Sequence, residues 1–489
     1  MSTSNLLSHP RTTHHAPRLT PHLPTLLLTL LILSYSIYFS WYSINRHNTL
    51  HSYAADLSLI DQPMWNTVIG SGNFMELTWG DQQQPRLAEH FEPILVPLAA
   101  LFYLWDDVRI LLIAQSVALA LGALPVYWIA RREVSSVKCQ VSSVKCQVSS
   151  VGHDQSTISI TNYQLPITNL QSLISNLPSW AALAFAAAYL LYPHLQAANI
   201  ADFHADPFVV APLLFAFWYA TEQRWGWMWF WAVIAMATKE TLPPLIAMLG
   251  VWLLMAGDRR PETGDRQTAT PPVSDPRSAV WHGLALILVS TAWFLIATYL
   301  IVAPLARQYF GSDSPIYFAS RYAYADGLAG LAAVLQDPVR WRYLFGLFAA
   351  AGFLPLLAPE LLLLGLPVLV ANFLSNFPGQ HSGEQHYSAP LVAAFILAAI
   401  YGTRRLLGWA SQREINGQPA KTTMLINASL WLLLWSLGYH ALHGWTPLSL
   451  RAELTAITRR RAFAPVASGH PPQAVISTQR GVVTPLIAG

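Results

Sequence analysis

The sequence predicts an all-α membrane protein with about eleven transmembrane helices. Its composition supports this: of 489 residues, 53% are hydrophobic and only 11% are charged. Soluble domains usually carry about 25% charged residues. The mean hydropathy is +0.36, and the 19 Trp and 19 Tyr residues fit the aromatic belts of membrane–water interfaces. We therefore read the chain as a series of membrane crossings.

Apolar runs bounded by charges, Pro or Gly define the expected crossings. The first run begins near Pro24, reaches Ile44 and has no small-residue cleavage site, so it predicts a retained helix rather than a signal peptide. The eleven expected crossings lie near residues 24–44, 108–130, 180–198, 208–221, 226–238, 241–257, 280–304, 342–358, 360–375, 389–403 and 423–441.

The distribution of Lys and Arg predicts the orientation of the chain. With a cytoplasmic N-terminus, most of these residues before His443 lie in the inner loops. We expect a cytoplasmic tail at 1–23, a membrane domain at 24–443 and an extracytoplasmic segment at 444–489. The β-rich pattern at 474–487 leads us to expect a partial, truncated outer domain there.

Two loops differ from the rest in composition. Residues 45–107 form a long, acidic outer loop, in which the apolar stretch 94–104 predicts helices lying on the membrane surface. Residues 133–178 contain the heptad Val-Ser-Ser-Val-Lys-Cys-Gln twice, followed by a polar tract, which is typical of a low-complexity cytoplasmic insertion. Both cysteines belong to this repeat, so we assign them no function.

The composition also excludes several functions. The net charge of +3, without a basic and aromatic stripe, argues against nucleic-acid binding. The sequence has no glycine-rich phosphate loop, no Gly-x-Ser-x-Gly and no His-Glu-x-x-His, so nucleotide-driven transport and the common hydrolases lose support.

Five clusters of ionisable residues are predicted to lie at the outer face. They are Asp56 with Asp61; His90 with Glu92; Asp202, His204 and Asp206; Lys239 with Glu240; and His381, Glu384 and His386. Ionisable groups next to hydrocarbon are costly and usually face a cavity or a pathway. We therefore predict that these residues, which are far apart in sequence, meet in one pocket at the outer rim of the bilayer.

Purely structural explanations compete with this prediction. Asp56 and Asp61 suit a solvated loop, and His90 suits a hydrogen-bonded cap at the interface. Lys239 and Glu240 suit a neutralising ion pair at a helix end. The set of His381, Glu384 and His386 matches no standard zinc spacing, so we predict no cofactor and keep a divalent metal as the alternative.

Six short motifs in order resemble a known family. They are Asp56-Leu57-x-x-x-Asp61-Gln62-x-x-Trp65, His90-Phe91-Glu92-Pro93, Leu190-Leu191-Tyr192-Pro193, Asp202-Phe203-His204, Thr238-Lys239-Glu240 and His386-Tyr387. Together they resemble the bacterial and archaeal membrane proteins catalogued as domain of unknown function 2079. The likeness covers roughly residues 25–445 outside the insertion and implies the plasma (inner) membrane of a prokaryote. The chain has Ala55-Asp56-Leu57-Ser58 where the family usually has Phe-Asp-Leu-Gly.

The plan of that family is similar to the C-type glycosyltransferases, which transfer a sugar from a polyprenyl-phosphate carrier outside the membrane. The resemblance implies that Asp56 or Asp61 is the catalytic carboxylate, acting as general base. Lys239, with Arg321 or His204, would neutralise the leaving lipid phosphate. The other expected substrate-binding residues are His90, Glu92, Asp202, Asp206, Glu240 and His386.

Two other functions use the same residues. A transporter or flippase for an anionic lipid or solute would use them for binding and proton relay. Such proteins commonly show internal repeats and broken helices at mid-membrane, and we see no clear repeat between the two halves. A non-catalytic scaffold would tolerate substitution of the outer-face charges.

Overall fold

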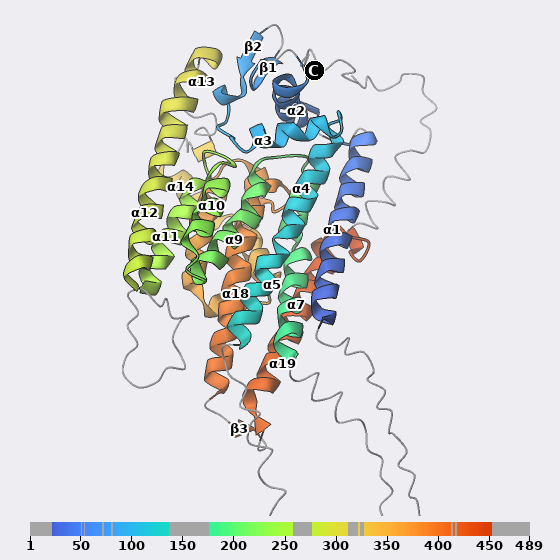
Figure 1. The fold of residues 1–489 in the computed structure, drawn as a ribbon, viewed down its shortest axis with the longest axis vertical. Coiled ribbons are helices and arrows are strands. Elements are labelled where there is room, and N and C mark those ends of the chain that lie inside the picture. The colour runs from blue at the N-terminus through green and yellow to red at the C-terminus, as the bar shows by residue number, and fades with distance from the viewer. Residues whose placement is uncertain are drawn as a thin grey trace, which may run out of the picture.

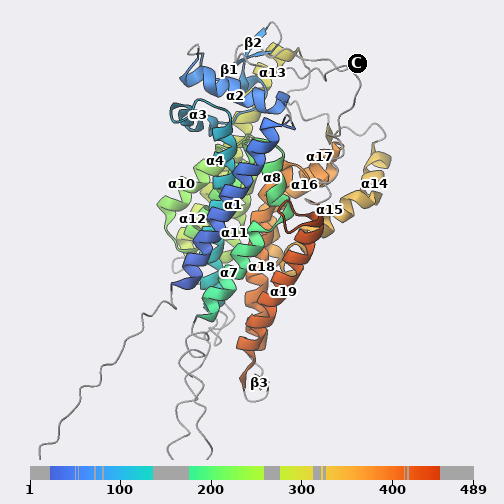
Figure 2. The same cartoon turned by 90° about the vertical axis from the view of Figure 1, so that its right-hand side faces the viewer.

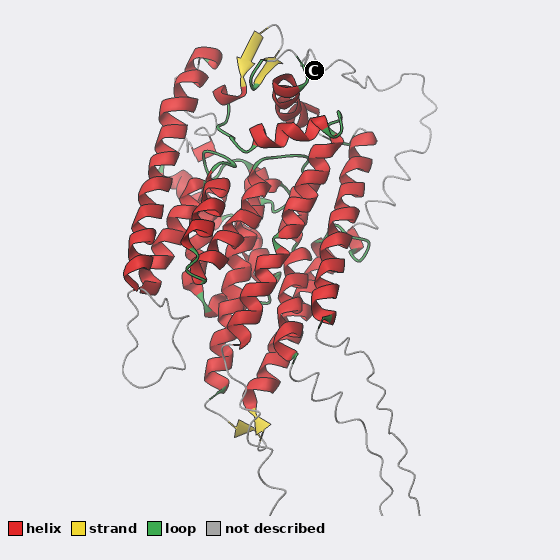
Figure 3. Ribbon diagram, in the orientation of Figure 1, coloured by secondary structure: helices red, strands yellow, loops and turns green. Residues whose placement is uncertain are grey.

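The computed structural model describes residues 22–49, 51–52, 54–70, 73–79, 82–135, 176–257, 276–311, 321–322, 327–411, 414–415 and 418–451. The chain forms an elongated bundle of helices with a small layer across one end, here called the upper end because it is at the top of Figure 1. Within the described residues, strands occur as two short antiparallel hairpins (Figure 3). The prediction of an all-α membrane protein agrees with this architecture.

Five helical segments of the described residues are long and apolar enough to cross a membrane, namely Leu23–Asn48, Arg109–Ser135, Pro276–Phe310, His386–Ala410 and Ala420–His443. Shorter apolar helices occupy Leu177–Leu190, Asp206–Thr221, Trp225–Met236, Pro243–Ala256 and Pro359–Leu374. All ten coincide with predicted crossings. The predicted crossing at 342–358 falls on α15 (Pro338–Ala349) and the short helix η6 (Leu354–Leu357).

Helix α18 (Ala389–Ala410) forms the centre of the bundle. It packs against α5 (Ala123–Ser135), α9 (Val210–Thr221), α19 (Ala420–His443) and the short helices η6 and η7 (Pro359–Gly365). Its N-terminal part is buried at every position, as expected for a helix that is apolar on all sides. It begins at the upper end, so its first residues lie beside the upper-end loops (Figure 1).

The outer helices expose apolar side chains. Leu288 of α12 (Pro276–Leu295) is 70% exposed, and Leu434 of α19 is 68% exposed. Large apolar side chains at such positions are typical of a surface that faces lipid. Helices α12, η4 (Ile296–Val302, π-helical) and α13 (Ala303–Phe310) form one long segment that ends at Gly311, which has a left-handed backbone (φ +60°).

Two predicted boundaries are corrected by the structure. The predicted crossing at 180–198 is broken into α7 (Leu177–Leu190) and α8 (Pro193–Ile200), because Pro193 cannot continue a helix and favours an extended residue before it. The predicted insertion at 133–178 begins later, because α5 continues through Ser135. Residues 136–175 of that insertion, the tail at 1–21 and residues 452–489, with the predicted β-rich segment, lie outside the described residues.

A connection near the middle of the second crossing depends on a glycine. Helix α4 (Arg109–Leu121) passes into α5 at Gly122, where the hydroxyl of Tyr189 donates a hydrogen bond to the carbonyl of Leu119 at 2.7 Å. A Cβ on Gly122 would lie 2.1 Å from that hydroxyl oxygen. The absence of a side chain therefore permits α4 and α7 to approach closely.

The upper layer is formed by the predicted first outer loop. It contains α2 (Ala54–Val68), the hairpin of β1 (Glu76–Trp79) and β2 (Gln82–Pro85), η1 (Arg86–Ala88), α3 (Leu95–Ala99) and η2 (Ala100–Tyr103). The last two are the short surface helices expected for residues 94–104. The layer has its own apolar core, which includes Leu57, Met64 and Phe102 and extends to Phe203 and Phe208 of the bundle.

That shared core explains where the polar residues lie. Phe203 and Phe208 enclose the sequence His204-Ala205-Asp206 and are both buried against the upper layer. Their burial holds the loop between α8 and α9 at the junction of the layer and the bundle. Figure 2 shows this junction from the side, where the turn η8 (His386–Ser388) contacts α8, α16 (Leu366–Leu374) and α17 (Pro378–His381).

Ion pairs stabilise the opposite, lower end. They join Glu133 to Arg404 at 2.6 Å, Arg132 to Glu222 at 2.7 Å, and Arg405 to Glu360 at 2.6 Å. These contacts connect α5, α9, α18 and η7 close to the ends of the helices.

Candidate functional site

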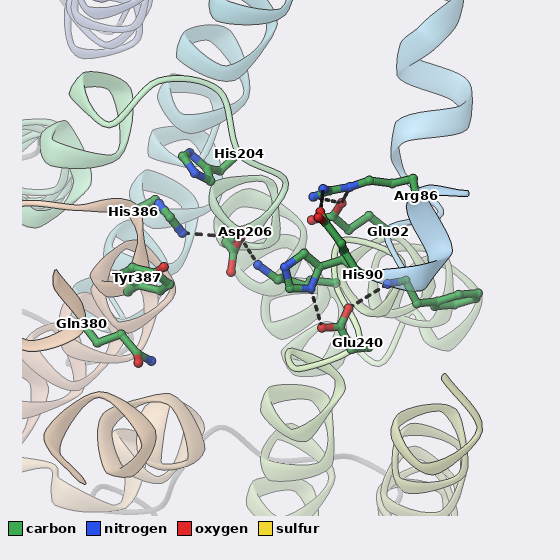
Figure 4. A network of polar contacts seen from close by, with 12 residues as sticks. Arg86, His90, Glu92, His204, Asp206, Glu240, Gln380, His386 and Tyr387 are labelled. Carbon is green, nitrogen blue, oxygen red and sulfur yellow. Dashed lines mark hydrogen bonds and ion pairs between the residues drawn. The ribbon is translucent and has the colours of Figure 1, made fainter. Parts of the chain in front are cut away.

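Three of the predicted clusters meet at Asp206. The ammonium nitrogen of Lys239 lies 3.1 Å from Asp206 Oδ2, and His386 Nε2 lies 3.9 Å from the same oxygen. The rings of His204 and His386 stack with their centroids 3.6 Å apart. Figure 4 shows His204 and His386 on one side of Asp206. The junction therefore combines residues from the segment before α9, the loop between α10 (Trp225–Met236) and α11 (Pro243–Gly257), and the turn η8 (His386–Ser388) that precedes α18.

The remaining contacts connect the upper layer to the bundle. Glu240 accepts a hydrogen bond from the backbone N–H of Phe91 at 2.9 Å, and its other oxygen lies 2.9 Å from His90 Nδ1. Glu92 is paired with Arg86, whose Nη2 lies 2.9 Å from a carboxylate oxygen. These contacts fix the His90-Phe91-Glu92 stretch above the α10–α11 loop.

Gln115 of α4 determines the shape of the loop that carries His204. Its amide nitrogen donates to the carbonyls of Ala198 and Asp202, both at 2.9 Å, and its amide oxygen accepts from the backbone N–H of His204 at 2.9 Å. Asp202 has φ +65°, a left-handed conformation that Asp adopts more readily than most residues. Sequence reasoning missed Gln115, although an amide inside an otherwise apolar helix is a usable signal.

Most of these polar groups are shielded from water. Asp206 is 6% exposed, Lys239 8% and His386 4%, and Glu240 is fully buried. Buried charges are stable only when they are paired, and each of these carboxylates has a cation or an N–H group as a partner.

The pairing sets the protonation of the groups in the loops. Burial opposes the charged form of Lys239, but Asp206 and the nearby acids outweigh it and hold the Lys239 pKa above its ordinary value. Burial also opposes the charged form of Glu240, yet His90 and Lys239 hold the pKa of Glu240 below its ordinary value. Burial lowers the pKa of His204, so its imidazole is neutral at neutral pH.

The two candidate catalytic acids differ in exposure. Asp56, in the first turn of α2, is exposed, and its charge acts electrostatically on His204. Asp61, one turn further along α2, is half-buried, and its Oδ1 atom is inaccessible to water. Asp56 is therefore the carboxylate that faces solvent while it remains within electrostatic range of the buried cluster.

The other predicted residues lie around the same junction. Asp202 is buried, and its backbone carbonyl is held by Gln115. The Nη1 atom of Arg321 lies 3.3 Å from the hydroxyl of Tyr387, the residue that follows His386. Sequence reasoning did not select Tyr387 or Arg86 as site residues.

The set of residues proposed as a possible metal site does not converge. His381 lies 3.5 Å from Arg340, Glu384 pairs with Arg451 at 2.7 Å, and His386 belongs to the Asp206 cluster. In the part of the chain that the structure describes, no group of three or more His, Cys, Asp or Glu side chains is arranged to hold a metal ion.

The fold and the site define a class: a helical membrane protein with a buried ionic cluster at one end, beneath a layer formed by its first long loop. A family model described as "Predicted membrane protein (DUF2079)" matches residues 46–150 and 157–455. The chain therefore belongs to this family, which confirms the resemblance found in the sequence motifs. A comparison with curated proteins found no match.

Proposed function

We infer that this protein is an integral-membrane glycosyltransferase that moves a sugar from a polyprenyl-phosphate carrier to an acceptor at its upper end. In this proposal the upper end faces the extracytoplasmic side of a prokaryotic plasma membrane, the N-terminus is cytoplasmic and the chain crosses about eleven times. One observation carries the proposal: an exposed carboxylate, Asp56, lies within electrostatic range of a buried ionic cluster at the membrane end of the bundle.

The chemistry assigned to Asp56 is general-base catalysis. Its carboxylate accepts the proton of an acceptor hydroxyl, and the oxygen forms a bond to the anomeric carbon of the sugar. The bond from that carbon to the phosphate oxygen breaks, and the electron pair leaves with the polyprenyl phosphate. A base has to reach the acceptor from the aqueous side, so exposure supports Asp56 over the half-buried Asp61.

The buried residues are assigned positioning roles. Lys239 is held by Asp206, and Glu240 holds His90 above the bundle. These pairs give the junction a fixed arrangement of charges without reorganisation during the reaction, which is the condition for electrostatic stabilisation of a transition state. The other residues that we propose to contact the substrate, or to hold the residues that contact it, are Glu92, Asp202 and His386.

Transport is the competing function, and the positions of the charges argue against it. The buried charged residues of the described chain are Arg86, Glu92, Glu133, Asp202, Asp206, Lys239, Glu240 and Arg340. Each lies in a loop or in the first or last turn of a helix. Proton and ion relays through a membrane place such groups near the middle of the bilayer, so an enzyme active at one face is better supported.

The test is sugar transfer by the purified, reconstituted protein. A panel of labelled polyprenyl-phosphate sugars is supplied with candidate acceptors, and the wild type is compared with Asp56→Asn and Asp106→Asn. Asp106 is an exposed acid of the same layer, so it is the matched control. We expect Asp56→Asn to lose transfer by about a hundredfold or more while the control retains it.

Two results would contradict the proposal. One is full transfer by Asp56→Asn. The other is movement of an unmodified lipid or solute across proteoliposomes without any covalent change, which would identify a transporter.

A further inference from the structure

The charges of the cluster are unevenly distributed. On one side, the single guanidinium of Arg86 lies among the carboxylates of Glu89 and Glu92, with Glu240 close by. On the other side of Asp206, the charge of Arg321 acts on His386, while Lys239 pairs with Asp206 and is also within electrostatic range of Glu92 and Glu240. Figure 4 shows His386, Tyr387 and Gln380 on this second side of Asp206. On this second side Arg321 adds a positive charge, whereas the acids Glu89, Glu92 and Glu240 gather around Arg86.

Arg321 differs from Lys239 in its partners. No carboxylate among the described residues forms an ion pair with it. Its Nη1 instead lies 3.3 Å from the hydroxyl of Tyr387 and 3.5 Å from the amide oxygen of Gln380. The guanidinium lies 4.6 Å from the ring centroid of Phe377 and 5.5 Å from that of Tyr387.

This arrangement holds Arg321 in place, and no carboxylate of the described residues neutralises its charge. The backbone N–H of Asn376 donates to the Arg321 carbonyl at 2.7 Å. Gln380 is itself held by the hydroxyl of Ser375, which donates to its amide oxygen at 2.5 Å. A guanidinium that rests on aromatic faces and is bonded to neutral acceptors keeps its capacity for a bidentate contact with an anion.

His386 supplies an independent observation. It is 4% exposed, and its Nδ1 has no hydrogen-bond partner among the described residues. Its ring lies 4.0 Å from that of Tyr387, and the charge of Arg321 acts on it. Burying a ring nitrogen without a partner costs free energy, which is recovered if a ligand atom bonds to it.

We propose that Arg321, Tyr387 and His386 form a subsite for a phosphate group, with Gln380 as the positioning residue of Arg321. The guanidinium supplies parallel N–H donors to two phosphate oxygens, and the Tyr387 hydroxyl and His386 Nδ1–H supply single donors. Lys239 does not fill this role, because Asp206 already neutralises it. Identification of this phosphate with that of the lipid carrier rests on the proposed function.

Binding, measured without turnover, tests the subsite. Isothermal titration calorimetry of the full chain in detergent compares three probes: inorganic phosphate, farnesyl phosphate and farnesol. The variants are Arg321→Gln and Tyr387→Phe, and the control is Arg307→Gln, which removes an exposed arginine of α13 at the same end. We expect Arg321→Gln to weaken farnesyl phosphate binding by about tenfold or more, Tyr387→Phe by less, and the control not at all.

The probes separate the sources of the phosphate. Binding of farnesyl phosphate much tighter than inorganic phosphate identifies a lipid ligand, and equal binding identifies a free phosphate ion. Equal binding of farnesol and farnesyl phosphate overturns the proposal, as does wild-type affinity in Arg321→Gln. If Arg321→Gln does not fold, wild-type affinity in Tyr387→Phe overturns it.

This result is independent of the transferase test. Phosphate binding that depends on Arg321, in a protein that transfers no sugar, leaves the subsite established and refutes the transferase. If sugar transfer depends on Asp56 but phosphate binding does not change in Arg321→Gln, the subsite is refuted and the transferase is not.

Discussion

The imidazole of His90 lies 2.9 Å from a carboxylate oxygen of Glu240, although 150 residues separate them in the chain. The second oxygen of Glu240 binds the N–H of Phe91, so both of its acceptors serve the upper layer. The Glu240 carboxylate, which belongs to the bundle, thus holds the upper layer in place. This layer carries Asp56 and lies over the cluster that contains Lys239.

Removal of the Glu240 charge should loosen the upper layer. In Glu240→Gln the buried carboxylate that binds the Phe91 N–H and the His90 ring loses its charge, so we expect a loss of stability of about 2 kcal/mol or more. The measurement is thermal unfolding in detergent. Glu384→Gln is the control, since its pair with Arg451 is exposed and should contribute less than about 1 kcal/mol. An equal effect of the two substitutions would show that the layer is held by other contacts.

The Lys239–Asp206 pair should show strong coupling. Asp206→Asn or Lys239→Met leaves the partner as a buried, unpaired charge, which typically costs about 3–5 kcal/mol. The double variant removes both charges, so we expect it to be more stable than either single variant. Melting temperatures of the four proteins give the coupling free energy. Additive effects would mean that the two charges are separately solvated.

Stability should fall in mild acid because of His204. Its folded pKa is lower than the 6.5 of the unfolded chain, so below that pH the unfolded state takes up a proton and the folded state does not. The stability that neutral His204 contributes to the folded state is therefore fully present above pH 6.5 and decreases as the pH falls below this value. His204→Phe keeps a ring against His386 without titrating, and should flatten the dependence of melting temperature on pH.

A matched substitution checks the source of that dependence. His51→Phe removes a half-buried histidine of the first outer loop, whose hydrogen bond to Thr49 is exposed, and should leave the slope near that of the wild type. A wild-type slope in His204→Phe would assign the acid sensitivity to other groups.

Gln115 should affect stability and ligand binding through the loop between α8 and α9, which it holds by hydrogen bonds. Gln115→Leu removes two donors and one acceptor while keeping the volume, so the carbonyls of Ala198 and Asp202 and the N–H of His204 lose their bonds to this side chain. We expect a loss of about 1–3 kcal/mol for each buried group left unsatisfied. Thermal unfolding measures this loss, with Gln83→Leu on exposed β2 as the control. Farnesyl phosphate affinity should fall as well, because His204 supports the ring of His386; unchanged affinity would separate the loop from the subsite.

Composition and apolar periodicity were sufficient to predict a helical membrane protein, because burial in lipid selects long apolar segments, and the resemblance to the family rested on six short motifs. The positions of the apolar runs also predicted that Asp56, His90, His204, Lys239 and His386 lie near the ends of helices. The sequence also contained the break at Pro193, since proline removes a backbone donor and is favoured in the first turn of a new helix, although the continuous apolar run concealed it.

Only the tertiary structure decided which of these groups are partners. The contacts of His90 with Glu240 and of Lys239 with Asp206 depend on how distant helices pack, and no local pattern encodes them. Packing also distinguished the neutralised cation, Lys239, from Arg321, which has only neutral hydrogen-bond partners among the described residues. Charges far apart along the chain act on one another only after the fold has brought them within a few ångströms of each other and away from water.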